Sequence, residues 1–196
     1  MRSHALTVTP LLIGYFPKRI TPKPDWINAP AVIEICSVSG CIATAPENWI
    51  QHWTHNELWV YDTVAAARAV IPAGQEAQFA LYAYRIVPTI FPEGVSNALE
   101  IPVRPEPLAP GFSSLGFDVV SRSAGTNFEC SPLSCCDLAA DWNANQFCLL
   151  PDLDTAVAAA RRFSVEQPEP GPYVVIEVLR ERRTSLEAAR SNPIDG

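Results

Sequence analysis

The same sequence landmarks occur twice along the chain, in the same order. A C-S-x-x-x-C pattern begins at Cys36 and again at Cys130, 94 residues later. Alanine-rich runs at 62–68 and 154–161 follow at nearly the same offset, and an apolar run ending in arginine comes after each. Ordered landmarks at a constant offset are the signature of an internal repeat. We therefore expect an internal duplication, which constrains the fold more than any single motif does.

Two further pairs of residues fit the same repeat. A glycine followed by an aromatic residue stands early in each half, at Gly14 and Gly116. Asn56 and Asn145 each stand just before a short apolar run. We expect residues 1–100 to form the first half and 112–183 the second. These halves are joined by a proline-rich connector over 101–111 and followed by a C-terminal tail over 184–196.

The spacing of apolar residues predicts the order ββαβαβ in each half. The fold class is therefore α+β, with two similar halves packed about a pseudo-twofold axis. Helices are expected from Thr44 and Asp62 in the first half, and after Ser131 and near Asp152 to Asp154 in the second. The predicted strands are 11–16, 31–37, 57–61 and 79–87, and then 115–120, 126–130, 146–150 and 173–179.

Composition excludes several classes of protein. Charged residues make up 18% of the 196 residues and hydrophobic residues 48%, which argues against disorder over most of the chain. The net charge of −7 argues against a nucleic-acid partner, because such a protein needs a basic face. No apolar run is long enough for a membrane span or a secretory leader. We expect a soluble protein of the bacterial cytoplasm, whose six cysteines are thiols or metal ligands.

The two cysteine loops could form a metal site. Brought together by the pseudo-twofold axis, Cys36, Cys41, Cys130 and Cys135 would supply four thiolates suited to Zn²⁺, with iron as another candidate. The alternative is that these cysteines pack in the core as small buried thiols, because free cysteine is often buried. We expect no cofactor, and a zinc or iron site is the alternative.

Thiol catalysis is a second possible chemistry for these loops. A cysteine nucleophile needs a base, which is most often histidine. The pairs that the sequence offers join Cys36 or Cys41 to His52 or His55. None of the common catalytic or nucleotide-binding motifs occurs. The sequence therefore favours a protein without enzymatic activity.

An aromatic segment over residues 49–61 is the candidate binding element. Trp49, His52, Trp53 and His55 would form an anchor patch, since tryptophan is enriched where partners bind. In the alternative interpretation the tryptophans cover the sheet and Asn56 ends a helix. Glu34 and Arg180 are expected to be solvated.

We therefore predict a non-catalytic binding or regulatory protein. Its negative charge suits a basic protein partner, which we expect in preference to a small molecule. A metalloprotein and a thiol enzyme are the two alternatives.

Overall fold

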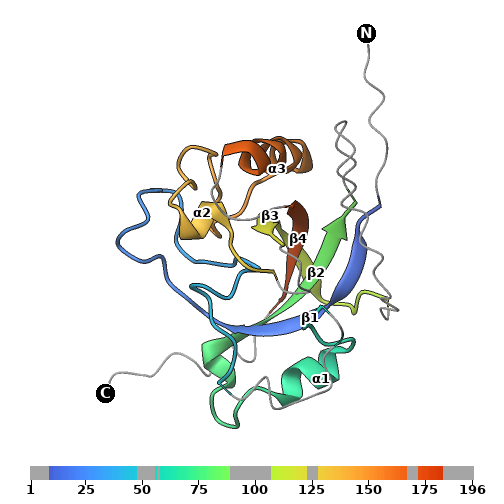
Figure 1. Cartoon of the computed structure of the whole chain (residues 1–196). Coiled ribbons are helices and arrows are strands. Elements are labelled where there is room, and N and C mark those ends of the chain that lie inside the picture. Colours follow the sequence, from blue (N-terminus) through green and yellow to red (C-terminus); the bar gives the residue numbers. More distant parts are fainter. Residues whose placement is uncertain are drawn as a thin grey trace.

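A single antiparallel sheet organises the computed structural model. The structure describes residues 9–47, 56, 58–88, 107–122, 128–166 and 172–182. Four strands form the sheet in the order β1-β2-β4-β3, so the two halves of the chain share it (Figure 1). Its strands are β1 (Leu11–Arg19), β2 (Phe79–Val87), β3 (Phe112–Ser121) and β4 (Tyr173–Glu181).

The strand pairing in one half is repeated in the other. Gly14 of β1 pairs with Tyr84 of β2, and Gly116 of β3 pairs with Val178 of β4. Each glycine lies beside a register shift, and each has a positive φ, 143° at Gly14 and 136° at Gly116. At the middle of the sheet Tyr84 pairs with Val178. Exchanging the two halves therefore leaves the pairing pattern unchanged.

The loops that precede the helices α1 and α3 also make matching hydrogen bonds. The Asn56 side-chain amide donates to the carbonyl of Ile13, and its oxygen accepts from two backbone N–H groups within its own loop. The Asn145 side chain makes the corresponding bonds, donating to the carbonyl of Leu115. Both asparagines therefore tie a loop to an edge strand, because a side-chain amide can donate and accept at once.

Within the described residues, three α-helices and one 3₁₀ helix accompany the sheet. They are α1 (Val64–Ala69), η2 (Glu76–Gln78), α2 (Pro132–Cys135) and α3 (Leu153–Glu166). The expected helix starts near Asp62 and Asp152 are present, but Thr63 and not Asp62 caps α1. Asp152 accepts from the Thr155 N–H at 2.8 Å and so caps α3. These bonds lower the pKa of Asp152.

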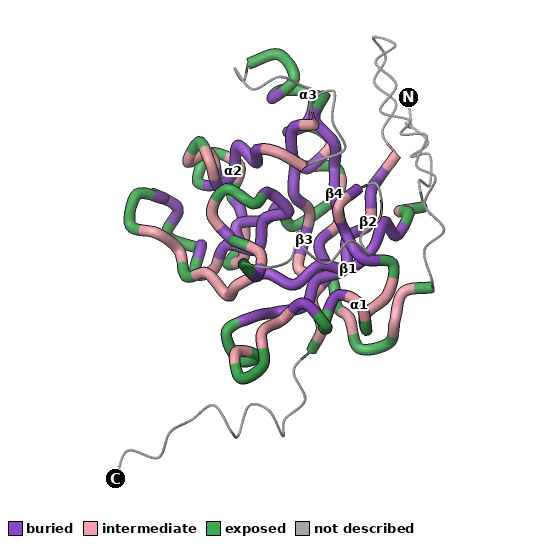
Figure 2. Tube along the Cα trace, turned by 60° about the horizontal axis from the view of Figure 1, so that its bottom comes forward, coloured by how far each residue is buried: buried purple, intermediate pink, exposed green. Residues whose placement is uncertain are grey.

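Two apolar clusters fill the core. One joins Tyr15, Tyr61 and Tyr82 with Ala67 of α1, and the other joins Phe163 and Ala159 of α3 with the sheet. Figure 2 shows buried residues along most of the strands, whereas exposed residues gather in the loops. No helix among the described residues is long and apolar enough to cross a membrane.

Several predicted strands are wrong. Residues 31–37 and 146–150 contain single bridges but no strand, although both runs are buried in large part. The described part of the run at 57–61 likewise contains one bridge, at Tyr61, and no strand, and the described part of the run at 126–130 contains neither a bridge nor a strand. The residues from Thr44 to Glu47 are not helical, and the rest of that predicted helix lies outside the described residues. The result is a mixed α/β fold with a four-stranded sheet in place of eight predicted strands.

Candidate functional site

Loop 37–39 is held between two buried charges. The Lys18 Nζ atom donates to the carbonyls of Ser37 at 2.8 Å, Val38 at 2.6 Å and Ser39 at 2.5 Å. Burial lowers the Lys18 pKa to about 7, and the attraction of Asp118 opposes this change. In its protonated form Lys18 uses all three N–H bonds of the ammonium group and serves the loop as a structural cation.

Asp118 holds the opposite side of the same loop. One oxygen accepts from the Ser37 hydroxyl at 2.7 Å and from the Val38 N–H at 2.8 Å. The other accepts from the Ser131 hydroxyl at 2.6 Å. Ser37 and Ser131 are the serines of the two C-S-x-x-x-C patterns, so one carboxylate joins both cysteine loops. A buried carboxylate with several hydrogen bonds is stabilised in this way despite its desolvation.

Sequence reasoning missed this pair of charges, although a signal was available. Asp118 stands inside the predicted strand 115–120, and Lys18 stands just beyond the predicted strand 11–16. A charged residue within an apolar strand requires a buried partner.

The loops bring three of the four candidate cysteines together. Burial raises the pKa of both the Cys41 and the Cys130 thiol, and the neighbouring Cys135 thiol raises both further. Cys36 lies against Tyr82 and Arg180 instead, at 3.5 and 3.9 Å from its sulfur. Among the described side chains, no three His, Cys, Asp or Glu residues could together hold a metal ion. The metal site therefore stays a prediction.

The protonation of Cys36 does not favour thiol catalysis. Burial, with the negative charge of Glu34 as a second cause, raises its pKa to about 12. A cysteine nucleophile needs the opposite shift, since the thiolate is the reactive form. Both candidate bases, His52 and His55, lie outside the described residues. Thiol catalysis therefore stays a prediction, and the raised pKa of Cys36 does not support it.

Glu34 and Arg180 form a half-buried ion pair rather than solvated groups. The Arg180 Nη1 atom donates to both Glu34 carboxylate oxygens at 2.8 Å. Its guanidinium also lies 5.0 Å from the centre of the Phe147 ring. This pair joins the loop after β1 to β4 and rests on the sheet face that carries Tyr82, because Tyr82 and Arg180 are directly paired.

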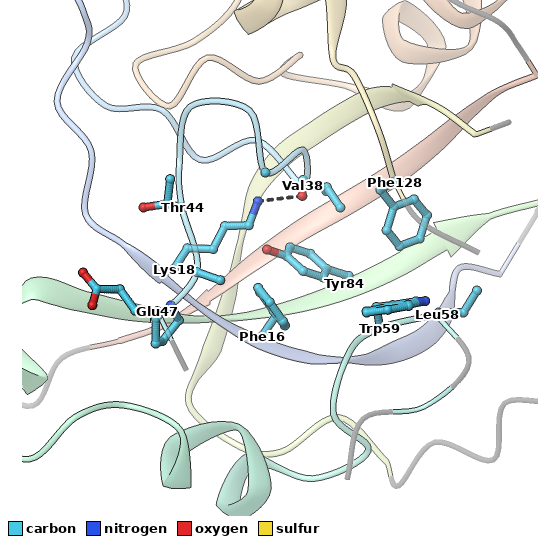
Figure 3. Close-up of a pocket in the computed structure, with 12 residues that line it drawn as sticks. Phe16, Lys18, Val38, Thr44, Glu47, Leu58, Trp59, Tyr84 and Phe128 are labelled. Carbon is cyan, nitrogen blue, oxygen red and sulfur yellow. Dashed lines mark hydrogen bonds between the residues drawn. The ribbon is translucent and has the colours of Figure 1, made fainter. Parts of the chain in front are cut away.

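A cavity of about 570 Å³ lies beside loop 37–39 (Figure 3). Its apolar wall is made by Phe16, Leu58, Trp59 and Phe128 together with Val38 and smaller side chains. The polar side chains on the lining are those of Lys18, Thr44, Glu47 and Tyr84. Phe128 comes from the second half of the chain, so both halves contribute. An apolar cavity of this size with a few polar groups is typical of a ligand site.

Tyr84 is the polar group that this cavity leaves unsatisfied. Its side chain is 1% exposed, and its hydroxyl has no hydrogen-bond partner within the described structure. Burial raises its pKa well above the usual value, so the hydroxyl is a neutral donor. Buried hydroxyls nearly always have partners, and an exception in a cavity wall indicates a place for a ligand acceptor.

The predicted anchor residues Trp49, His52, Trp53 and His55 lie outside the described residues. The chain on either side of them is described, however, and both flanks line the cavity. Glu47 stands before the segment 49–61, and Leu58 and Trp59 belong to its described part. The described part of the predicted binding element therefore contributes to the cavity wall.

Comparisons with known proteins add no relative. The chain matches no protein-family model, no curated protein and no solved structure.

Proposed function

We propose that this protein is a non-catalytic binding protein that holds an aromatic side chain of a basic partner protein in the cavity. The observation that carries the proposal is the buried, unpartnered hydroxyl of Tyr84 in a wall that is otherwise mostly aromatic and aliphatic. A ring fills such a space, and an acceptor on the ring would take the Tyr84 proton donor. Tyrosine carries both the ring and the acceptor.

Charge supports a basic partner. The chain has a net charge of −7, and the carboxylate of Glu47 stands in the cavity lining. Opposite charge on the partner would speed association and exclude acidic competitors. The Lys18 ammonium, which is the cation among the described lining residues, already donates three hydrogen bonds to loop 37–39. It therefore offers no free donor to an incoming anion.

The lining also favours binding over catalysis. Its described titratable groups are Lys18, Glu47 and Tyr84. The first is committed to loop 37–39, and the third is held neutral by burial. Among these groups no nucleophile is paired with a base, which is the arrangement that covalent catalysis needs.

The experiment measures binding of p-cresol and toluene, the side-chain analogues of tyrosine and phenylalanine, by tryptophan fluorescence. We expect p-cresol to bind at one site and Tyr84→Phe to weaken it about threefold to tenfold, the value of one hydrogen bond. The affinity for toluene should be unchanged. Tyr82→Phe is the matched control, because Tyr82 is not among the lining residues. Equal loss of both probes in Tyr84→Phe, or no binding of either, would contradict the proposal.

Two short peptides distinguish a protein partner from a free small molecule. A tyrosine flanked by arginines should bind more tightly than p-cresol, and a tyrosine flanked by glutamates more weakly. The difference should shrink as salt is added, because exposed charges are then screened. If p-cresol binds more tightly than both peptides, the ligand is a small molecule and the protein-partner part of the proposal is wrong.

We also infer that the two halves arose by internal duplication and are related by a pseudo-twofold axis through the Tyr84–Val178 pair. The matching glycine register shifts and asparagine loops support this inference. The two halves have diverged at the cavity, since Phe16 on β1 corresponds in register to Asp118 on β3. Phe16 lines the cavity, whereas Asp118 at the corresponding place holds loop 37–39.

A further inference from the structure

The two cysteine loops place an exposed thiol against a less exposed one. Cys41 is solvent-exposed and Cys135 is intermediate, whereas Cys36, Cys130 and Cys148 are buried. The two thiols lie on either side of one polar contact, since the Cys41 sulfur is 3.5 Å from the Glu129 carbonyl oxygen and the Cys135 sulfur is 3.9 Å from the Ser39 hydroxyl that donates to that carbonyl. This arrangement of an accessible thiol with a second thiol beside it is typical of cysteines that form a reversible disulfide.

Contacts between the loops hold the two thiols in place. The Ser39 hydroxyl donates to the carbonyl of Glu129 at 2.6 Å, and its oxygen lies 3.9 Å from the Cys135 sulfur. The Cys41 thiol donates to the same Glu129 carbonyl at 3.5 Å. Asp118 joins the two loops on the buried side, so the positions of the two loops relative to each other are fixed.

The loop has room for the small movement that a sulfur–sulfur bond requires. A disulfide brings the two sulfurs to about 2.05 Å, closer than any hydrogen-bonded pair. Gly40 directly precedes Cys41, and a Cβ added there would meet no atom within 4 Å. The side of the backbone on which that Cβ would lie, next to Cys41, is therefore open.

We propose that Cys41 and Cys135 form a reversible disulfide that joins the two cysteine loops. With hydrogen peroxide as the oxidant, the Cys41 thiolate attacks one peroxide oxygen, the oxygen–oxygen bond breaks, and hydroxide leaves and is protonated to water. Cys41 is then a sulfenic acid. Cys135 attacks its sulfur, the sulfur–oxygen bond breaks, and a second water leaves. Two electrons have passed from the thiols to the peroxide, and an external dithiol returns them by thiol–disulfide exchange.

The disulfide would act on the wall of the cavity. Val38 and Gly40 line the cavity on the loop that carries Cys41, and Phe128 lines it on the segment that leads to Cys135. The proposal does not rest on the identity of the cavity's ligand, since the two thiols can be assayed directly. Its failure would leave the proposed binding function unaffected.

The experiment oxidises the reduced full-length chain with hydrogen peroxide and maps the product by mass spectrometry. Because burial raises the pKa of the Cys41 thiol, the oxidation is run at pH 8.5, where more thiolate is present. Trypsin separates Cys36 and Cys41, on one peptide, from the other four cysteines, on another. A bond between the loops therefore links two peptides, whereas a bond between Cys130 and Cys135 stays within one. Fragmentation of the linked pair then identifies the two residues.

We expect loss of two of the six thiols, a Cys41–Cys135 link within one chain, and full recovery with dithiothreitol. Cys41→Ser should abolish the link. Cys136→Ser, the matched control at another exposed cysteine, should retain it. Four results would overturn the proposal: a bond between Cys130 and Cys135, a link that joins Cys136, a link between two chains, or irreversible oxidation of Cys41 while Cys135 remains a free thiol.

Discussion

Replacing Tyr84 by phenylalanine should stabilise the protein in the absence of ligand. The Tyr84 hydroxyl is buried without a partner in the described structure, and an unsatisfied buried hydroxyl costs about 1–3 kcal/mol. The Tyr84→Phe variant removes that cost and gives up the contacts of one oxygen atom. We expect a net gain of about 1 kcal/mol in the free energy of unfolding. For a chain of this length such a gain raises Tm by about 2–4 °C.

Tyr82 provides the internal comparison. Its ring stacks on that of Tyr84 with centroids 6.3 Å apart, so the two aromatic environments are alike. Its hydroxyl, however, has two hydrogen-bond partners, the Glu34 carboxylate at 3.4 Å and the Cys36 sulfur at 3.5 Å. Tyr82→Phe should therefore lose about 1 kcal/mol, the net value of a typical hydrogen bond. One chemical change at two neighbouring tyrosines thus has opposite expected signs.

Urea unfolding and thermal melts of the three proteins at pH 7 provide the measurement. The reasoning is refuted if Tyr84→Phe destabilises the protein as much as Tyr82→Phe does, because the Tyr84 hydroxyl would then have a partner in the free protein. The stabilised variant should also bind p-cresol more weakly. Gain of stability with loss of affinity is the combination expected of a polar group that is kept for a ligand.

Three further perturbations test the fold. Gly116→Ala should lower the free energy of unfolding, measured in urea, by about 2 kcal/mol or more, because the alanine Cβ would lie 2.6 Å from the Leu150 carbonyl oxygen and residue 116 has a positive φ. Gly40→Ala should be tolerated, because the added Cβ would lie in open space. Asn145→Ala should cost about 1–3 kcal/mol and lower Tm, since the backbone groups that it satisfies lose their partner. The folded pKa of Lys18 is lowered from 10.5 to about 7, so the unfolded chain binds more protons above pH 7. The free energy of unfolding should then rise by about 1 kcal/mol from pH 7 to 8, and Lys18→Met should abolish the rise. Above about pH 9 stability should fall, because the thiols with raised pKa stay protonated in the folded state only.

Apolar runs proved a better guide to burial than to strands. Residues 31–37 and 146–150 read as strands because they are short, apolar and bounded by polar residues. In the structure the two runs are joined by a few backbone hydrogen bonds. The N–H groups of Glu34 and Cys36 donate to the carbonyls of Gln146 and Phe147. A short apolar run does not reveal whether its N–H groups will form the regular hydrogen bonds of a β-sheet or only isolated ones.

Periodicity and capping along the sequence determined the four strands of the sheet, the starts of α1 and α3, and the ordered pairs of glycine, asparagine and cysteine landmarks. These features are local, because a few neighbouring residues decide each of them. Tertiary structure alone decided that Lys18 and Asp118 hold one loop from opposite sides, that Glu34 meets Arg180, and that the Tyr84 hydroxyl is buried without a partner in the described structure. Each of these depends on residues far apart in the chain, and burial then determines whether a charge or hydroxyl is solvated, paired or left for a ligand.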